Sequence, residues 1–317
     1  MSELNIVKQL PHCAYPTAND TDKHGFLELP KNLTKINWAA LKPYRTSNLD
    51  SIILKSLTNS EIIETANVVA SSFVKNEPIQ KHLKLPKQKP NNLAKPFADA
   101  FGENSFGEWS KENLFYWVIR LAILSDTGDN MLHGCKNEDT LNLSLAVKNK
   151  SDQIIGGMLC STLKTEEYSE ETEPFRFTIF ELFSKSMDFL FSQEHKAISA
   201  LSNNYSDFSK ALNNKKVGIV NMIAKANSFP KENIFELFAQ GIELFHKNEY
   251  EYVVVAGSNQ WTGAACEVMN GTRVHYNPYR DMQRLATEST ANIYEIYSED
   301  GYLSAKDSGV MFYILKL

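Results

Sequence analysis

The junction at residues 224–238, AKANSFPKENIFELF, is where an apolar run gives way to a helical pattern. A helix that begins after a strand presents free backbone N–H groups and the positive end of its dipole, and both favour phosphate binding. The same residues also describe an ordinary capped helix, with Ser228 as N-cap, Pro230 in the first turn and Glu232 opposing the dipole. The residues alone leave a phosphate site and a plain helix start as alternatives.

Candidate acid, base and nucleophile side chains are few. Glu77 stands at the end of a helical pattern, Cys266 and Glu267 share a second one, and Tyr276 lies in the strand that follows. A carboxylate such as Glu77 can take a proton from an amine, and a thiolate can attack a carbonyl carbon. Structural alternatives also exist. Glu77 can be a solvated carboxylate, Cys266 a buried thiol whose pKa nothing lowers, and Tyr276 a packed strand aromatic.

Several other chemistries have no motif in this chain. The four cysteines, Cys13, Cys135, Cys160 and Cys266, lack CxxC spacing, so neither a metal site nor a disulfide framework is expected. The chain has no Gly-x-Ser-x-Gly elbow, no Walker loop and no His-Glu-x-x-His pattern. These absences disfavour serine hydrolases, P-loop nucleotidases and zinc peptidases.

The composition predicts an ordinary globular protein. The net charge of -5 disfavours non-specific nucleic-acid binding, and the basic stretch 81–95 has the prolines and spacing of a solvated loop. No run approaches the roughly 18 to 20 apolar residues of a membrane helix. The N-terminus lacks the charged start and apolar block of a secretory signal. We expect a cytoplasmic protein with neither a nucleic-acid nor a membrane partner, and the sequence does not predict its oligomeric state.

The elements that hold these residues begin after an N-terminal arm, residues 1–50, which is rich in proline and polar residues. Residues 51–57 read as a strand, and Thr58 to Glu61 form a Ser/Thr-x-x-Glu capping box. A helix is then expected up to Pro78, with an apolar face at Ile62, Ala66, Val69 and Phe73. A second helix is expected over 108–124.

The remainder predicts an α/β (α+β) fold, a mixed sheet with helices on its faces. Residues 141–147 and 153–163 read as a hairpin, and Gly156-Gly157 indicates a bulge or a close backbone approach. Residues 164–214 read as a helical insertion, either a lid or a plain linker. Further strands are expected at 217–224, 250–257, 273–279 and 309–317, and further helices after residue 229 and at 261–269. The predicted domain runs over 51–317.

Two stretches carry a resemblance to a known family. ANVVASSFVKNEPIQKHL and YEYVVVAGSNQWTGAACEVMNGTRVHYNPY resemble the GNAT acyltransferase superfamily, the first looking like its arylalkylamine N-acyltransferase type. The resemblance covers roughly residues 51–281. It implies a mostly antiparallel sheet whose two central strands splay apart, and transfer of an acyl group from acetyl-CoA or another acyl-CoA to a small amine.

The resemblance also assigns roles to residues. It implies that Glu77 is the base, directly or through water, and that the strand around Asn221, Met222 and Ile223 pairs with the pantetheine arm. The remaining cofactor residues expected on this basis are Lys231, Glu232, Asn233 and Asn259. The family's acid, a tyrosine, falls at Cys266 or Glu267, so Tyr276 and Tyr279 in the next strand become further catalytic candidates.

The family's pyrophosphate loop, Arg/Gln-x-x-Gly-x-Gly/Ala, is degenerate here, since its positions hold Phe229, Glu232 and Ile234 with Pro230 beside them. Proline deletes one N–H donor, the bulky residues fill space that glycine leaves open, and Glu232 repels phosphate. Losing one or two charge-assisted hydrogen bonds weakens binding about ten- to several thousand-fold. The alternative to an N-acyltransferase is therefore a catalytically inactive GNAT-fold binding or regulatory protein.

Overall fold

The computed structural model describes residues 8–13, 16, 20–22, 24–46, 52–76, 83–84, 107–122, 137–163, 194–279, 295–296 and 309–317. The strands of its main sheet are β1 (Ile52–Lys55), β3 (Leu145–Lys148), β4 (Ile154–Thr162), β5 (Val217–Lys225), β6 (Tyr252–Gly257), β7 (Thr272–Pro278) and β9 (Gly309–Lys316). Their order in space is β1-β3-β4-β5-β6-β9-β7. Only β5 and β6 are parallel among these neighbours, so the sheet is mostly antiparallel. A two-residue strand β2 (Leu83–Lys84) pairs with β8 (Glu295–Ile296).

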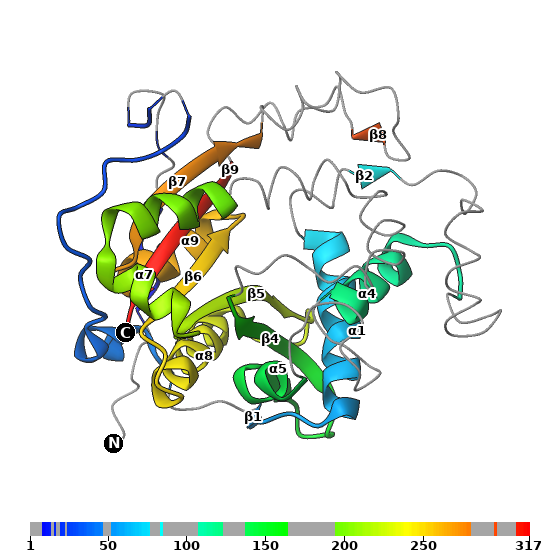
Figure 1. Ribbon diagram of the computed structural model, residues 1–317. Coiled ribbons are helices and arrows are strands. Elements are labelled where there is room, and N and C mark those ends of the chain that lie inside the picture. The colour runs from blue at the N-terminus through cyan, green and yellow to red at the C-terminus, as the bar shows by residue number, and fades with distance from the viewer. Residues whose placement is uncertain are drawn as a thin grey trace.

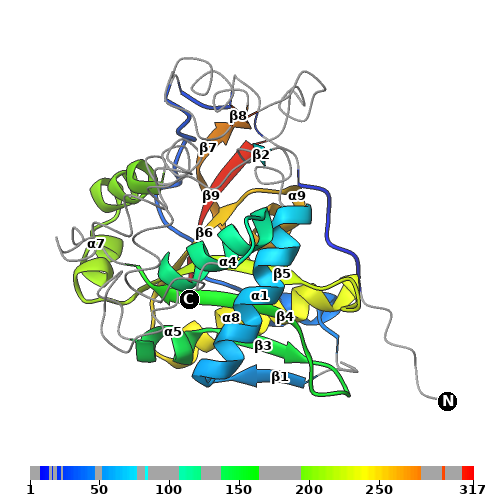
Figure 2. The same cartoon turned by 90° about the vertical axis from the view of Figure 1, so that its right-hand side faces the viewer.

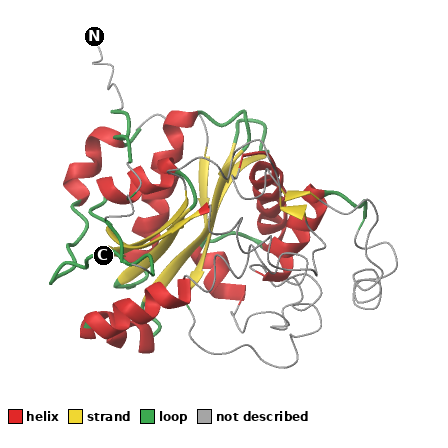
Figure 3. Cartoon of the chain, turned by 90° about the horizontal axis from the view of Figure 1, so that it is seen from above, coloured by secondary structure: helices red, strands yellow, loops and turns green. Residues whose placement is uncertain are grey.

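Helices lie on both sides of the main sheet, as Figure 3 shows from above. They are η1 (Trp38–Tyr44), α1 (Asn59–Asn76), α4 (Lys111–Ala122), α5 (Asn137–Leu143), α7 (Ser206–Asn213), η3 (Lys231–Asn233), α8 (Ile234–Lys247) and α9 (Gln260–Val268). A further helical segment covers 194–204. None of the helices in the described parts of the chain combines the length and the apolar character needed to cross a membrane.

Alternation along β4 divides the core between the two faces. Met158 and Cys160 pack against α8, whereas Leu159 between them packs against α1 and α4. Because successive strand residues point to opposite faces, one strand supplies both layers. Figure 2 shows α1 crossing β3, β4 and β5 with α8 behind them. The segment 194–204 and α7 extend the α1 face over β6 and β9.

The capping box at the start of α1 is confirmed. The Thr58 N–H donates to Glu61 Oε2 at 2.9 Å, and the Glu61 N–H donates to Thr58 Oγ1 at 3.3 Å. The first of these bonds holds the pKa of the Glu61 carboxyl below its usual value, and the Lys148 ammonium lowers it further. This carboxylate's contribution to stability is complete above its unfolded pKa and is lost as the pH falls through the lowered one.

Replacing Thr58 with alanine should lower the free energy of unfolding by about 1 kcal/mol, because one N–H of the first turn loses its cap. Thr58→Ser keeps the hydroxyl and should stay close to the parent protein. Urea unfolding of the two variants measures the difference. Equal midpoints for the alanine and serine variants would show that the cap contributes nothing.

The hairpin prediction is confirmed in its strands and wrong at its beginning. β3 and β4 pair antiparallel, but residues 141–143 end α5 instead of starting a strand. Leu143 is buried against the α8 layer as the last residue of α5, and a run of three alternating residues cannot separate a helix turn from a strand. A bulge in β4 and a close approach at Gly157 are both present, since a Cβ there would lie 2.3 Å from Thr65 Cγ2 of α1.

The elements of the last third are confirmed. The expected apolar face of α8 is buried at Leu237, Phe238, Gly241 and Phe245, and β6 is a buried central strand. α9 ends at Val268, and the chain turns away from it at Asn270, whose φ of 60° is left-handed, while the Gly271 N–H donates to the Cys266 carbonyl at 2.8 Å. Asparagine and glycine are the residues that close a helix in this way.

The described residues of 8–46 lie along β7, β9 and α8. Main-chain bonds join Leu27 to Val274 on β7 and Ile36 to Lys316 on β9. η1, which the sequence did not predict, packs beside α8 through Tyr44 and Phe235. The division of the chain at residue 50 stays a prediction, as does the insertion 164–214, of which the stretch 164–193 lies outside the described residues.

Candidate functional site

The two parallel central strands pair over only part of their length. Pairing runs from Val217 opposite Tyr252 to Val220 opposite Val255. Beyond this point β5 continues to Lys225 as a partner of β4, and β6 continues to Gly257 as a partner of β9. Figure 1 shows the two strands starting side by side and then separating. This parting, between residues 221–225 and 256–259, is termed the strand fork.

A bulge lies where the strand fork opens. The register of β4 on β5 passes from Cys160 opposite Val220 to Leu159 opposite Met222, so Asn221 is the extra residue. Its side chain donates from Nδ2 to Ser161 Oγ at 3.0 Å, which ties the bulge to β4. Within the described residues, the β5 backbone from Asn221 onward has no partner strand on its β6 side, so its groups on that side can bind an extended ligand.

The loop 226–230 leads from β5 toward α8 and holds its shape by internal contacts. Phe229 is only 1% exposed and belongs to the core beneath α8. The Lys225 ammonium donates to the Phe229 carbonyl at 2.8 Å, and the Phe229 N–H donates to the Ala226 carbonyl at 3.1 Å. The bulk expected from Phe229 therefore points inward and does not occupy the space above the loop.

The Ser228 cap, one of the two alternatives left open for this junction, is wrong. The chain passes through the 3-10 turn η3, with Pro230 as its N-cap, and α8 begins at Ile234 after Asn233. Neither cap residue makes a side-chain capping bond. Proline has no suitable side chain, and Asn233 has helical φ and ψ instead of the extended conformation of an N-cap.

The predicted cofactor residues on this side of the strand fork lie close together in the chain and in space. Lys231 and Glu232 lie in η3, and Lys231 is exposed. Asn233 is 6% exposed and is the last residue of η3, directly before α8.

The other side of the strand fork is formed by the end of β6 and the start of α9. Asn259 is the N-cap of α9, and its Oδ1 accepts from the Thr262 N–H at 3.0 Å. Tyr279, just after β7, donates its hydroxyl to the Ser258 carbonyl at 2.6 Å and fixes this edge. The Asn259 side-chain oxygen therefore caps α9, and its Nδ2 is the group that remains for a cofactor.

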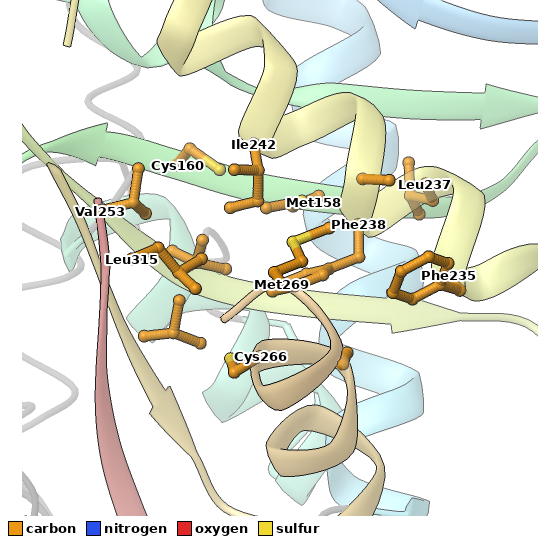
Figure 4. Packing of buried hydrophobic residues seen from close by; sticks show 14 of the residues in the cluster. Met158, Cys160, Phe235, Leu237, Phe238, Ile242, Val253, Cys266, Met269 and Leu315 are labelled. Atoms are coloured by element: carbon orange, nitrogen blue, oxygen red, sulfur yellow. The ribbon is translucent and has the colours of Figure 1, made fainter. Parts of the chain in front are cut away.

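Cys266 lies in the core between α9 and α8, among Met269, Leu315 and Phe238 (Figure 4). It is fully buried, and burial raises the pKa of its thiol well above the usual value. The thiol is therefore protonated at neutral pH, whereas a nucleophile needs the thiolate. Nothing in this environment favours covalent catalysis at Cys266.

Glu267, the neighbouring catalytic candidate, is held by three side chains. Its Oε1 accepts from Arg273 Nε at 2.7 Å, from the Tyr313 hydroxyl at 3.1 Å and from the Cys13 thiol at 3.2 Å. Arg273 also forms an ion pair with it. Glu267 therefore links α9 to β7 through Arg273, to β9 through Tyr313, and to Cys13.

Tyr276 lies level with the end of β6 but two strands away from it. Met311 of β9 pairs with Gly257 on one side and with Tyr276 on the other. Two strand spacings are about 10 Å, and the Tyr276 side chain is 6% exposed in the core beneath α8 and α9. Its assignment as an acid stays a prediction.

Glu77 lies outside the described residues, one position beyond the end of α1. The last turn of α1 is placed, because Phe73 and Val74 pack in the same cluster as Met222 of the strand fork. The chain therefore leaves α1 beside β5. This position is compatible with a base at Glu77, although no contact of that side chain is described.

Two residues of this region were missed by sequence reasoning. Lys225 bonds to carbonyl oxygens of the loop, and Arg45 bonds to Glu236 in the first turn of α8. The acid Glu236 within an apolar helical face was the only available signal, since a buried carboxylate requires a partner. Among the residues that the structure describes, no group of three or more His, Cys, Asp or Glu side chains could hold a metal ion.

Comparisons with known proteins identify the fold. No protein-family model and no curated protein matches the chain. Arylalkylamine N-acetyltransferase 7 of the yellow fever mosquito Aedes aegypti is similar in structure with a TM-score of 0.50 and 11% identity, over 84% of this chain and 87% of that one.

Two further structures match less well. The C-terminal condensation domain of Ebony, in complex with beta-alanyl-dopamine, has a TM-score of 0.49 and 12% identity over 85% of this chain and all of that one. The polyamine N-acetyltransferase of Drosophila melanogaster has a TM-score of 0.44 and 8% identity over 84% of this chain and all of that one. The sheet order, the strand fork and the likeness to the mosquito enzyme together show that the chain has the GNAT fold.

Proposed function

We propose that this chain is an acyl-CoA-dependent N-acyltransferase that acylates a small amine. The observation that carries the proposal is the strand fork, where β5 and β6 stop pairing after Val220 and Val255. Two parallel strands in the centre of a sheet normally satisfy each other's backbone groups, so a partial pairing needs a reason. A ligand with amide groups of its own would supply the missing partner.

The pantetheine arm of coenzyme A has this chemistry. Its two amides can exchange hydrogen bonds with the backbone of Asn221, Met222 and Ile223 in the manner of an added strand. The bulge at Asn221 is fixed to Ser161, so this backbone is positioned before the ligand arrives. Preorganisation of this kind reduces the entropic cost of binding.

The pyrophosphate would lie at the loop 226–233 and the start of α8. The burial of Phe229 leaves the outer side of the loop without that ring, and the absence of a side-chain cap at Asn233 leaves room at the helix terminus. Lys231 is exposed and can approach a phosphate oxygen. Asn233 and Asn259 offer amide groups on the two sides of the strand fork.

The chemical step requires a base more than an acid. Glu77 would take a proton from the ammonium, and the free amine nitrogen would attack the thioester carbonyl carbon. The C–S bond then breaks and the electron pair leaves with sulfur. A thiol has a pKa of about 8.5, so its thiolate leaves without an essential proton donor. The burial of Cys266 at the family's tyrosine position is compatible with this mechanism.

The second candidate is a GNAT-fold protein that binds a ligand without catalysis. The observation in its favour is that Cys266 is buried and Glu267 is engaged with Arg273, Tyr313 and Cys13, so α9 offers no free acid in the described region. Such a protein would keep the strand fork as a binding site. It would not release free thiol from an acyl-CoA.

A thermal-shift measurement with coenzyme A tests both candidates. At a concentration 100 times the dissociation constant, a ligand that binds only the folded chain stabilises it by about 2.7 kcal/mol, which raises the Tm by several degrees. No rise at millimolar coenzyme A would overturn the acyltransferase proposal. A rise together with thiol release from acetyl-CoA in a panel of small amines would support it, whereas binding without release would favour the second candidate.

A further inference from the structure

Arg45 forms a cluster with two glutamates on α8. Its guanidinium grips Glu236 with two bonds, from Nε to Oε2 at 2.9 Å and from Nη2 to Oε1 at 2.6 Å. Nη1 pairs with Glu243, two turns further along the helix. Gln240 donates a third bond to Glu236 Oε1 at 2.8 Å. Bidentate arginine–carboxylate pairs are the strongest and most directional of the protein ion pairs.

Glu236 lies at the helix end to which the proposed function assigns the pyrophosphate, so both negative groups would share the start of α8. It lies in the first turn of α8, directly after the loop 226–233, and its side chain is only 5% exposed. A carboxylate in the first turn interacts with the positive end of the helix dipole, which is the field that an anionic ligand needs. Unless its charge is compensated, Glu236 would repel a pyrophosphate through the low-dielectric interior.

The packing of η1 against α8 holds the Arg45 guanidinium beside Glu236. Arg45 follows η1, and its N–H closes that turn on the Lys42 carbonyl at 3.3 Å. The Tyr44 ring meets Phe235 edge-on at 6.0 Å, beside Glu236 in the sequence. The ammonium of Lys8 lies over the Tyr44 ring, 5.1 Å from its centre. These contacts hold Arg45 against the start of α8.

We propose that Arg45 is a positioning residue for coenzyme A, which neutralises Glu236 so that the start of α8 can receive the pyrophosphate. The inference rests on the proposed function, because it assumes that the pyrophosphate lies at the loop 226–233. It deepens that function by giving residues of the N-terminal arm a part in cofactor recognition. It also gives a role to the acid in the first turn of α8, since the Arg45–Glu236 pair sets the charge at this helix end.

The test is the affinity for coenzyme A, measured by titration calorimetry. Arg45→Gln leaves Glu236 uncompensated and should weaken coenzyme A binding roughly tenfold, because the carboxylate then repels the phosphates without a counter-charge. The double variant Arg45→Gln/Glu236→Gln should return to within about threefold of the parent, and Arg45→Lys, which keeps the charge, should lose less than Arg45→Gln. Pantetheine, which has no phosphate, should bind all variants within about twofold of the parent.

Two controls separate this role from a structural one. Lys148→Gln removes a similar ion pair, with Glu61, on the opposite side of the sheet and should leave the affinity unchanged. The Tm of each variant reports whether it is folded, and the rescue by Glu236→Gln would be absent if Arg45 only held η1 in place. Failure of that rescue, or equal losses for coenzyme A and pantetheine, would overturn the inference alone. A parent protein without affinity for coenzyme A would overturn the proposed function and the inference with it.

Discussion

Replacing Phe229 with alanine should lower the free energy of unfolding by about 3–5 kcal/mol, the usual cost of emptying a buried phenylalanine site. The ring is 1% exposed and packs in the core beneath α8 with Phe235 and Tyr276. Urea unfolding, with the midpoint and the slope fitted separately, measures the loss.

The same replacement should also weaken coenzyme A binding by at least about tenfold at temperatures where the variant is folded. The backbone of Phe229 holds the loop through Lys225 and Ala226, and the ring anchors that backbone to the core. Without the anchor the loop samples other conformations, and the population able to bind falls with it.

Phe245→Ala is the matched control for both effects. Phe245 is fully buried near the C-terminal end of α8, far along the helix from the loop, and its ring lies over Gly218. It should lose a similar amount of stability and keep its affinity for coenzyme A within about twofold. An equal loss of affinity in both variants would show that the loop has no special dependence on Phe229.

The regular elements could be predicted because each is specified by neighbours in the sequence. The capping box of Thr58 and Glu61 depends on residues three apart, and both of its bonds are present. The buried face of α8 repeats with the helical period, and β6 is a continuous apolar run. The error at residues 141–143 occurs where a short run fits both periods, so only tertiary packing decides.

The loop before α8 could not be predicted from its composition alone. The sequence places Phe229 at the Arg/Gln position of the family's loop, with Glu232 and Ile234 at its glycine positions, which suggests a blocked site. Whether a side chain points inward or outward depends on the core it meets. The structure buries the ring under α8. In place of a cap at Ser228 the chain forms η3, so α8 begins only at Ile234.

The electrostatic partners at the site were beyond prediction because they are far apart in the sequence. Arg45 and Glu236 are separated by 191 residues, and Cys13 and Glu267 by 254. No periodicity or spacing rule joins such positions, and without aligned relatives no pattern of paired changes can reveal them. The side chains of Glu236 and Glu267 therefore looked alike as isolated acids, although both are engaged by an arginine in the structure.

Replacing Glu77 with glutamine should lower kcat/KM for amine acylation by about 10²- to 10⁴-fold, the usual contribution of a general base. Glutamine has nearly the same size but cannot accept the proton of the ammonium. Glu77 lies outside the described residues, and α1 ends one position before it, with Phe73 and Val74 of its last turns in the same apolar cluster as Met222. Steady-state rates of thiol release with a saturating amine measure the loss.

The pH profile decides whether the loss has this cause. With Glu77 as the base, the parent rate should rise with pH through an ionisation that the glutamine variant lacks, and the variant should regain rate only when the amine itself deprotonates at higher pH. The affinity for coenzyme A should stay within about twofold. Glu64→Gln, which changes an exposed glutamate on α1, is the matched control and should keep the parent rate and profile. A normal rate and an unchanged profile in Glu77→Gln would remove Glu77 from the mechanism.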